Sequence, residues 1–537
     1  MLPTWLRRSV VLLLVLGVFF RFYHLDYKVY WLDETYTSLR VSGYTREEFV
    51  EQVVTGNVVG VETLQHYQYP TVEKDLTDTL KSIAVEDPHN APLYFVLARI
   101  WLQGFGNSIT VIRSLSAVIS LLAFPCLWWL CRELFQSSLP GWIAIALFAT
   151  TPLHLLYAQE ARYYSLWTVL TLLSSAVLLW AIRQQSRLSW ATYGLTVALG
   201  LYTHLLFSTV AIAHGVYIAI TELAITELAT PELAETITTP TQPKLRKRQS
   251  GKIILSYLLA TGAAVLAFIP WLIMIKPGFE KVGNDSDFST EAHSLAELLD
   301  RWFLNLNRAF LGEELYSANF ILVLLVVFAL YFLCRKAPTR TWLFILLLAG
   351  VPFLIFAFPD VVLGGGRSLR IRYLIPSYIA IQIALAYLFA SQAVWTSTWQ
   401  TKLWRMGLIT FMVSSIVGCT VISQAQIWWN KGVGRCGYYV PVTDLINQTT
   451  NPLVIGSRDP MEILGLSDRL DPDVKLQLVR EPQQLKISEG FDSVFLISPS
   501  QPLRRSLKQQ NYRLKLVYEE PDTDDVDKDR LWKALKR

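Results

Sequence analysis

The stretch RRSVVLLLVLGVFF, from Arg7 to Phe20, determines how the rest of the chain is interpreted. A basic start followed by an apolar run is typical of a signal peptide. No small-residue cleavage site follows, however, and Arg21-Phe22-Tyr23-His24 is typical of a membrane–water interface. We therefore predict a retained membrane helix whose N-terminus lies in the cytoplasm, in a bacterial cytoplasmic membrane.

The composition of the whole chain indicates the same class of protein. Of its 537 residues, 52% are hydrophobic and only 17% are charged, whereas soluble domains carry about 25% charged residues. Ten further apolar segments approach the length that spans a bilayer. They are residues 110–130, 140–158, 163–182, 190–204, 205–221, 252–275, 317–334, 341–358, 373–393 and 406–424. The sequence thus predicts an all-α polytopic membrane protein with about eleven transmembrane helices.

The loops between these segments predict the orientation of the helices. Positive charge gathers in cytoplasmic loops, and the even-numbered spans exit into the cytoplasm if the first helix runs outward. Basic residues follow each even-numbered span, at 132, 183, 187, 244–248, 335–336, 340, 402 and 405. Residues 222–251, which include a five-residue repeat, are then a cytoplasmic linker.

Two regions are predicted on the outer side. Residues 25–91 form a long outer loop with amphipathic stretches at 46–54 and 73–84, and residues 92–105 form an outer juxtamembrane helix. Residues 431–537 alternate short apolar runs with helical segments, which predicts a small extracytoplasmic α/β domain. We expect strands near 453–455, 474–479, 493–497 and 514–518, and helices near 461–466 and 503–510. The predicted division is a transmembrane domain, 1–430, followed by the α/β domain, 431–537.

Polar residues gather at the outer ends of the predicted spans. Asp33 and Glu34 follow the first span, where an ionisable pair is either functional or an ordinary interfacial charge. The other candidates are His89, Glu160, Arg162, Tyr163, His204, Arg367, Arg370 and Arg372. Glu160 and Arg162 could instead pair with each other, and His204 could serve packing. The last three arginines run against the positive-inside bias, and they could bind either a substrate lipid phosphate or ordinary anionic headgroups.

This set of residues suits group transfer from a membrane-embedded donor with a phosphate leaving group. Such a reaction needs one general base, for which Asp33 is the candidate, and one cationic site for the departing phosphate. It needs no general acid, unlike glycoside hydrolysis. A transporter or flippase of lipid-linked sugars would share the helices and the phosphate site, but its ionisable residues would be expected near the bilayer midplane. A non-catalytic scaffold would leave the acids and arginines unexplained.

Five short segments, taken together, resemble one family. Trp31-Leu32-Asp33-Glu34 is similar to the Asp-Glu motif of the C-superfamily glycosyltransferases, in the branch of the protein O-mannosyltransferases and lipid A aminoarabinose transferases. The other segments follow in the same order, at residues 89–94, 159–163, 202–204 and 372–376. One departure concerns the second segment, which usually reads His-Pro-Pro-Leu-Tyr and here reads His89-Asn90-Ala91-Pro92-Leu93-Tyr94.

The resemblance implies an integral membrane enzyme that moves a sugar from a polyprenyl-phosphate-linked donor to an acceptor outside the cytoplasm, with inversion. It implies that Asp33 is the base, that Glu34 positions or tunes it, and that the arginines before residue 373 face the lipid phosphate. Some members of the family use a divalent metal ion, which Asp33, Glu34 and His89 could hold. The implied partners are the donor, an acceptor that is a protein, a glycan or a lipid, and the bilayer, but no nucleic acid.

Overall fold

The computed structural model describes residues 3–224, 243–282, 293–313, 319–394, 398–431, 436–456, 459–480, 485–520 and 529–536. The chain folds into two compact units. The helical unit comprises Met1–Tyr23, His89–Leu93 and Ser116–Ser423. The sheet unit comprises His24–Pro88, Tyr94–Leu115 and Gln424–Arg537.

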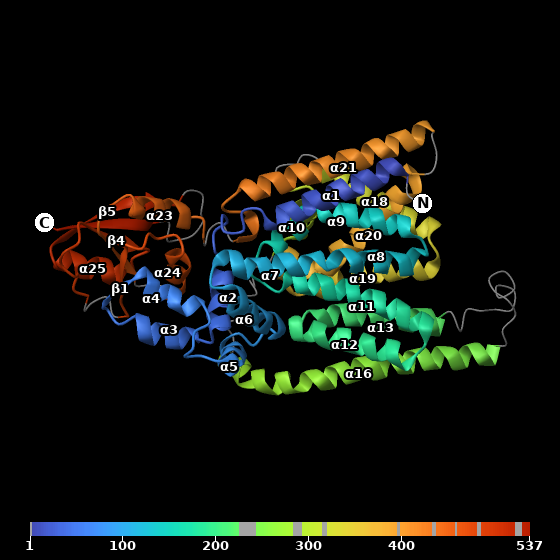
Figure 1. Cartoon of the computed structure of the whole chain (residues 1–537), viewed down its shortest axis with the longest axis horizontal. Coiled ribbons are helices and arrows are strands. Elements are labelled where there is room, and N and C mark those ends of the chain that lie inside the picture. Colours follow the sequence, from blue (N-terminus) through green and yellow to red (C-terminus); the bar gives the residue numbers. More distant parts are fainter. Residues whose placement is uncertain are drawn as a thin grey trace. The chain divides into compact units, whose positions relative to one another are not determined.

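The helical unit is built from long apolar helices that pack against one another. In Figure 1 its helices α8, α11, α12 and α13 run side by side. Helix α20 contacts α9, α18 and α19 and is almost completely buried. The helices are α1 (Thr4–Phe22), α8 (Ala123–Phe135), α9 (Ser138–Ala149), α10 (Pro152–Ala158), α11 (Tyr164–Gln184), α12 (Arg187–Thr203), α13 (Phe207–Ala219), α16 (Pro243–Val282), α17 (Leu295–Phe310), α18 (Asn319–Lys336), α19 (Thr339–Leu363), α20 (Ile375–Ala393) and α21 (Trp399–Gln424). Helix α7 (Ile109–Leu121) has residues in both units.

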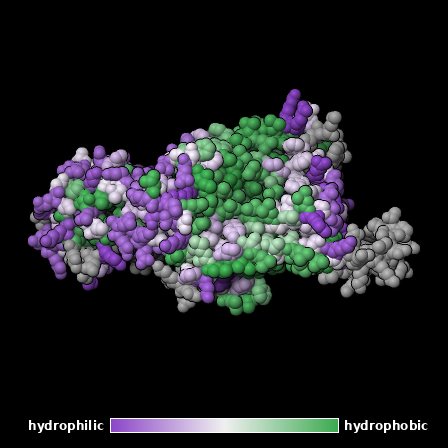
Figure 2. Space-filling view, turned by 60° about the horizontal axis from the view of Figure 1, so that its bottom comes forward, coloured by the Kyte–Doolittle hydropathy of each residue, from purple (hydrophilic) through white to green (hydrophobic). Residues whose placement is uncertain are grey.

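Seven helical segments among the described residues are long and apolar enough to cross a membrane, or eight if the bent pair α9–α10 counts as one span. The helices α1, α12 and α13 occupy the places of the three other predicted spans without meeting the same test. Figure 2 shows a broad hydrophobic surface over the helices of this unit. These observations support an integral, multi-pass membrane protein. Most of the predicted linker 222–251 lies outside the described residues.

A buried arginine stabilises the break between α9 and α10, which are bent by 61°. Arg21 in α1 donates to the carbonyl oxygens of Phe148 and Ala149 at the C-terminal end of α9, at 3.4 and 2.8 Å, and to Ser120 Oγ at 3.1 Å. A cation at a helix C-terminus is favourable because the last carbonyl groups have no partner within the helix. Helix α1 approaches α9 closely at Gly17, where a Cβ atom would lie 2.5 Å from the Ala149 oxygen.

The sheet unit contains a six-stranded sheet in the order β1-β3-β2-β4-β6-β5. Strand β2 pairs in parallel with β3 and β4, and the other neighbouring pairs are antiparallel. The strands are β1 (Val58–Gly60), β2 (Pro452–Gly456), β3 (Lys475–Leu478), β4 (Ser493–Ile497), β5 (Tyr512–Glu519) and β6 (Asp529–Lys536). The helices are α2 (Leu32–Ser42), α3 (Arg46–Val53), α4 (Val61–Gln65), α5 (Leu76–Glu86), α6 (Leu93–Phe105), α23 (Tyr439–Asn447), α24 (Pro460–Ser467) and α25 (Gln501–Gln509). In Figure 2 the surface of the sheet unit is mostly hydrophilic.

The first outer loop contributes directly to this sheet. Strand β1 comes from residues 25–91 and pairs antiparallel with β3, with Val59 opposite Leu476. The two parts of the chain also share one hydrophobic core, in which Trp31 and Phe49 pack in the same cluster as Tyr439 and Leu464. The division expected at residue 431 therefore does not coincide with the compact units, because residues 24–88 and 436–531 bury their apolar side chains together.

The predicted fold class is confirmed: a mostly helical protein with apolar membrane-length helices and a small mixed sheet. The four expected strands of the C-terminal part correspond to β2, β3, β4 and β5, and the two expected helices correspond to α24 and α25. Strands β1 and β6 were not predicted. β1 has only three residues, and β6 carries Arg530, Lys533 and Lys536 on a strand that is paired on both sides.

Candidate functional site

The two carboxylates of the acidic motif lie in the first turn of α2. Acidic side chains are favoured there because the N-terminal N–H groups of a helix carry partial positive charge. Successive residues of an α-helix point about 100° apart, so the two side chains enter different surroundings. Asp33 is half-buried, whereas Glu34 is completely buried. The motif thus separates one accessible carboxylate from one that is enclosed.

Two cationic side chains hold Glu34 in place. Arg113 of α7 makes a bidentate salt bridge, with Nε 2.8 Å from Oε1 and Nη2 2.7 Å from Oε2. Lys431 adds a second salt bridge, 3.1 Å from Oε2. All three side chains are at most 1% exposed. Both oxygens of Glu34 therefore accept charge-assisted hydrogen bonds, which are stronger than those between neutral groups.

Arg113 also fixes the segment that precedes the motif. Its Nη1 donates to the carbonyl oxygens of Leu25 and Lys28 at 2.7 and 2.9 Å, and its Nη2 donates to that of Val29 at 3.0 Å. A single buried guanidinium thus joins α7, the turns before α2 and the first turn of α2. The position of this turn is strongly determined.

A second buried arginine holds the other end of α2. Arg99 of α6 donates through Nη1 to the carbonyl oxygens of Val41 and Ser42, at 2.9 and 3.2 Å, and to Thr79 Oγ1 at 3.1 Å. These carbonyl groups belong to the last turn of the helix, which ends at Gly43 with a left-handed φ of 93°. The backbone that carries Asp33 is consequently fixed at both ends.

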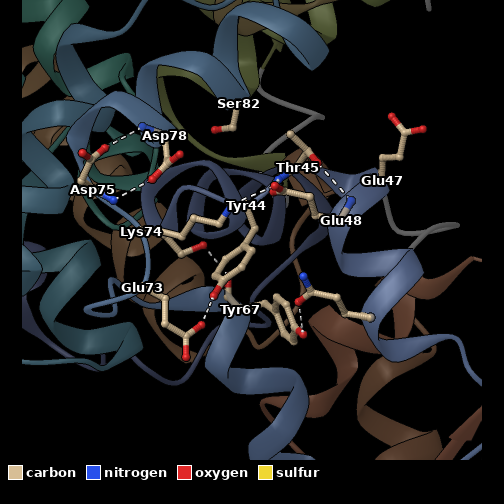
Figure 3. A network of polar contacts seen from close by, with 12 residues as sticks. Tyr44, Thr45, Glu47, Glu48, Tyr67, Glu73, Lys74, Asp75, Asp78 and Ser82 are labelled. Carbon is tan, nitrogen blue, oxygen red and sulfur yellow. Dashed lines mark hydrogen bonds and ion pairs between the residues drawn. The ribbon is translucent and has the colours of Figure 1, made fainter.

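A network of polar contacts supports the end of α2 from the surrounding loop (Figure 3). Tyr44 Oη donates to Glu73 Oε2 at 2.8 Å, and Lys74 Nζ donates to Glu48 Oε1 at 2.8 Å. Helices α3 and α5 each begin with a capping box, in which side chains satisfy the first backbone N–H groups. These contacts order the loop in the region where α2 ends.

Two more ionisable groups are buried near Glu34. The pKa of the Lys28 ammonium is lowered from 10.5 to about 7, chiefly by burial and then by the charges of Lys431 and Arg113, which Glu34 opposes. The pKa of the Asp468 carboxyl is raised from 3.8 to about 7, chiefly by burial, against the lowering effect of Gln68 and Arg113 and with a small contribution from Glu34. Both groups therefore exchange their proton close to neutral pH in the folded protein.

These two pKa shifts predict a pH dependence of stability. Between pH 3.8 and 7 folded Asp468 keeps a proton that the unfolded chain has lost, so its contribution to stability falls as pH rises. Between pH 7 and 10.5 unfolded Lys28 keeps a proton that the folded state has lost, so its contribution rises with pH. We expect the melting temperature of the D468N variant to change less with pH between pH 3.8 and 7 than that of wild type. For K28M we expect the same between pH 7 and 10.5. If both variants show the wild-type dependence of melting temperature on pH, the pKa shifts of Asp468 and Lys28 do not cause it.

In the helical unit, the structure brings several of the other predicted residues together. Glu160 and Arg162 lie in the turn between α10 and α11 and are buried. The guanidinium of Arg162 lies 4.8 Å from the centre of the Tyr163 ring. That ring is in turn 4.5 Å from the imidazole of His204, which follows α12. The turns after α10 and α12 thus form one cluster.

The imidazole of His204 is held in a defined orientation. It stacks on Trp167 at 5.2 Å with an angle of 8° between the rings. Its Nδ1 accepts the backbone N–H of Leu206 at 3.0 Å, so Nε2 is the nitrogen that carries the proton in the neutral ring. Asn90 forms a β-bridge with His204, which brings the segment after His89 beside the cluster. His89 itself is exposed and meets Phe279 edge-on at 4.9 Å.

The three predicted phosphate-binding arginines differ in their surroundings. Arg367 donates to Asp360 Oδ1 at 3.2 Å, and Asp360 Oδ2 also accepts from the backbone and hydroxyl groups of Ser368. Arg370 is exposed. Arg372 is half-exposed beside Tyr373, and its charge acts on Tyr163 and His204. Arg372 is therefore the arginine that belongs to the His204 cluster, while Arg367 stabilises its own loop.

The loop that carries these arginines is anchored by α17. Trp302 Nε1 donates to Ser368 Oγ at 3.0 Å, and Asn305 Nδ2 donates to the Leu369 carbonyl oxygen at 2.9 Å. Helix α17 is amphipathic and begins with a capping box at Ser294. Its polar side chains thus hold the turns between α19 and α20 in a fixed shape.

Among the described residues, no group of three or more His, Cys, Asp or Glu side chains is placed to hold a metal ion. Glu34 does not fit a metal ligand, because both of its oxygens already accept hydrogen bonds from cations. Asp33 and Glu34 belong to the sheet unit and His89 to the helical unit.

Residues 89–237 match the sequence model of a family described as dolichyl-phosphate-mannose-protein mannosyltransferase. No curated protein matches the chain in sequence. Among solved structures, the chain is similar to ArnT from Cupriavidus metallidurans bound to undecaprenyl phosphate, with a TM-score of 0.54 at 12% identity over 99% of this chain and 98% of ArnT. ArnT in the apo state gives a TM-score of 0.51 at 13% identity, over 99% and 97% of the two chains. The Archaeoglobus fulgidus oligosaccharyltransferase in complex with Zn and sulfate gives 0.49 at 13% identity, over 96% and 72%.

At this level of identity the likeness to ArnT shows a common fold, and the score of the oligosaccharyltransferase is too low to carry an argument. The matched family region contains the candidates from His89 to His204. Together, the family match and the ArnT-like fold indicate the C superfamily of membrane glycosyltransferases and confirm the resemblance found in the sequence.

Proposed function

We propose that this chain is a glycosyltransferase that moves a sugar from a polyprenyl-phosphate-linked donor to an acceptor on the extracytoplasmic side of the membrane. The observation that carries the proposal is the asymmetric acidic motif: Asp33 is accessible, while its neighbour Glu34 is fixed by Arg113 and Lys431. A half-buried carboxylate at a fixed helix N-terminus is suited to act as a general base. The family match of residues 89–237 supports the reaction class.

In the proposed reaction, the Asp33 carboxylate takes the proton of the acceptor hydroxyl or amine as its oxygen or nitrogen bonds to the anomeric carbon. The bond between that carbon and the phosphate oxygen breaks, and polyprenyl phosphate leaves with the electron pair. Attack from the face opposite the leaving group inverts the anomeric centre. Cationic donors next to the departing phosphate stabilise its growing charge.

Arg372 is the proposed contact for the lipid phosphate, because it is half-exposed and lies in the same cluster as His204 and Tyr163. A planar guanidinium can donate two parallel hydrogen bonds to a phosphate. Arg370, which is exposed, is the second candidate. Arg367 is a weaker one because of its salt bridge to Asp360. The proposed acceptor is a protein, a glycan or a lipid.

The test uses purified protein in liposomes with a panel of labelled polyprenyl-phosphate sugars, and compares wild type with the R372Q variant. Loss of one charge-assisted contact of about 1.5–3 kcal/mol should raise the KM for the donor about ten- to hundredfold. R187Q is the matched control, because Arg187 is an exposed arginine at the start of α12, in a loop predicted to be cytoplasmic, and its KM should match wild type.

The same experiment separates the transferase from its rival. Consumption of one donor with release of polyprenyl phosphate supports the proposed function. If no donor is consumed and the labelled lipid instead crosses the bilayer, the protein is a flippase or transporter and the proposal is wrong.

A further inference from the structure

The C-terminal residues of the sheet unit have no role in the reaction described above, yet they contact the helix that carries Asp33. Lys431 follows the last membrane-length helix and forms the salt bridge to Glu34 Oε2. Just before it in the chain, the Gln426 carbonyl oxygen accepts the backbone N–H of Val29 at 2.9 Å. These contacts join residues 426–431 to the acidic motif and to the segment that precedes it.

Helix α24 makes a second, independent contact with α2. The two helices approach so closely that a Cβ atom on Gly465 would lie 2.8 Å from Thr35 Oγ1. Thr35 is the residue directly after Glu34 and is completely buried. Gln68 Nε2 donates to the Leu464 carbonyl oxygen at 2.9 Å, which ties the first outer loop to the same helix. A side chain larger than that of glycine would push α24 away from α2.

We propose that the C-terminal part of the chain positions the general base: Lys431 and Gly465 hold the first turn of α2 so that Asp33 stays in its productive place. This inference rests on the proposed function, in which Asp33 takes the proton of the acceptor. Lys431 and Gly465 are positioning residues, since they act on α2 and not on the substrate. The assignment gives residues 431–537 a task within the reaction itself.

The two salt bridges of Glu34 explain why Lys431 can position α2 without being essential for folding. When Lys431 is removed, Glu34 still has its bidentate salt bridge to Arg113, so no buried charge is left without a counter-charge. What is lost is one restraint on the first turn of α2. A misplacement of a catalytic group by about 1 Å can lower a rate about 10²-fold.

The main experiment measures kcat and KM of K431M in liposomes. We expect kcat to fall at least tenfold, with the KM for the donor within twofold of wild type. K431R keeps the charge that pairs with Glu34 and should restore most of the lost kcat. K508M is the matched control, because Lys508 is an exposed lysine of α25.

A second set of variants tests the Gly465 contact without changing any charge. G465A should lower kcat because the added methyl group meets Thr35 Oγ1. T35A removes that oxygen, so the double variant G465A/T35A should regain most of the lost activity, and the two changes should not be additive. If K431M fails to fold, this pair and K431R decide the question.

The outcomes separate this inference from the proposed function. If the D33N variant loses turnover while K431M and G465A keep the wild-type kcat, the positioning role is wrong and the transferase assignment stands. If folded D33N turns over normally, Asp33 is not the base, and both the proposed mechanism and this inference are overturned.

Discussion

Replacing Asp33 with asparagine should lower turnover about 10²–10⁴-fold, the range that a positioned general base contributes to catalysis. The substitution preserves the size of the side chain but removes its ability to accept a proton. Asp33 lies in the first turn of α2, and the contacts of Glu34 and Arg99 fix this helix. The variant should therefore fold normally and bind the donor with an unchanged KM.

The measurement is transfer of labelled sugar by D33N in liposomes, at saturating donor, after its thermal unfolding has been shown to match wild type. D26N is the matched control, because Asp26 is an exposed aspartate in the same loop and should retain full activity. A folded D33N protein with wild-type turnover would remove Asp33 from the reaction.

The membrane helices could be predicted from the sequence because hydropathy depends on local composition alone. All eleven predicted spans correspond to helices or to pairs of consecutive helices. The strands β2 to β5 were also visible, since each is a short apolar or alternating run. The pairing of β1 with β3 was not, because a three-residue strand has no periodic signal and its partner lies more than 400 residues further along the chain.

The candidate site shows the same limit. The Asp-Glu pair could be recognised from its position after the first span, but the partners of Glu34 lie 79 and 397 residues away in the sequence. Arg99 and Arg113 had one usable signal, a positive charge within an otherwise apolar segment, which often marks a buried polar contact. Lys431 had none. Arg367 was grouped with Arg370 and Arg372 by spacing, although the structure pairs it with Asp360.

Replacing Arg113 with methionine should destabilise the sheet unit by about 3–5 kcal/mol, which is the usual effect of removing one partner from a buried salt bridge. Arg113 is completely buried and donates to Glu34 and to three backbone carbonyl groups, so its loss leaves several acceptors without a donor. R113K should not restore stability, because an ammonium cannot reproduce the bidentate geometry.

Thermal unfolding would measure the loss of stability of the whole protein. Amide hydrogen exchange of the α2 peptides would show whether this loss is located in α2. R46M provides the control: Arg46 forms an exposed salt bridge with Asp459 at 3.7 Å, and such pairs contribute at most about 1 kcal/mol. If R113M and R46M destabilise the protein equally, and exchange in α2 is the same in both, the buried salt bridge between Arg113 and Glu34 does not hold α2.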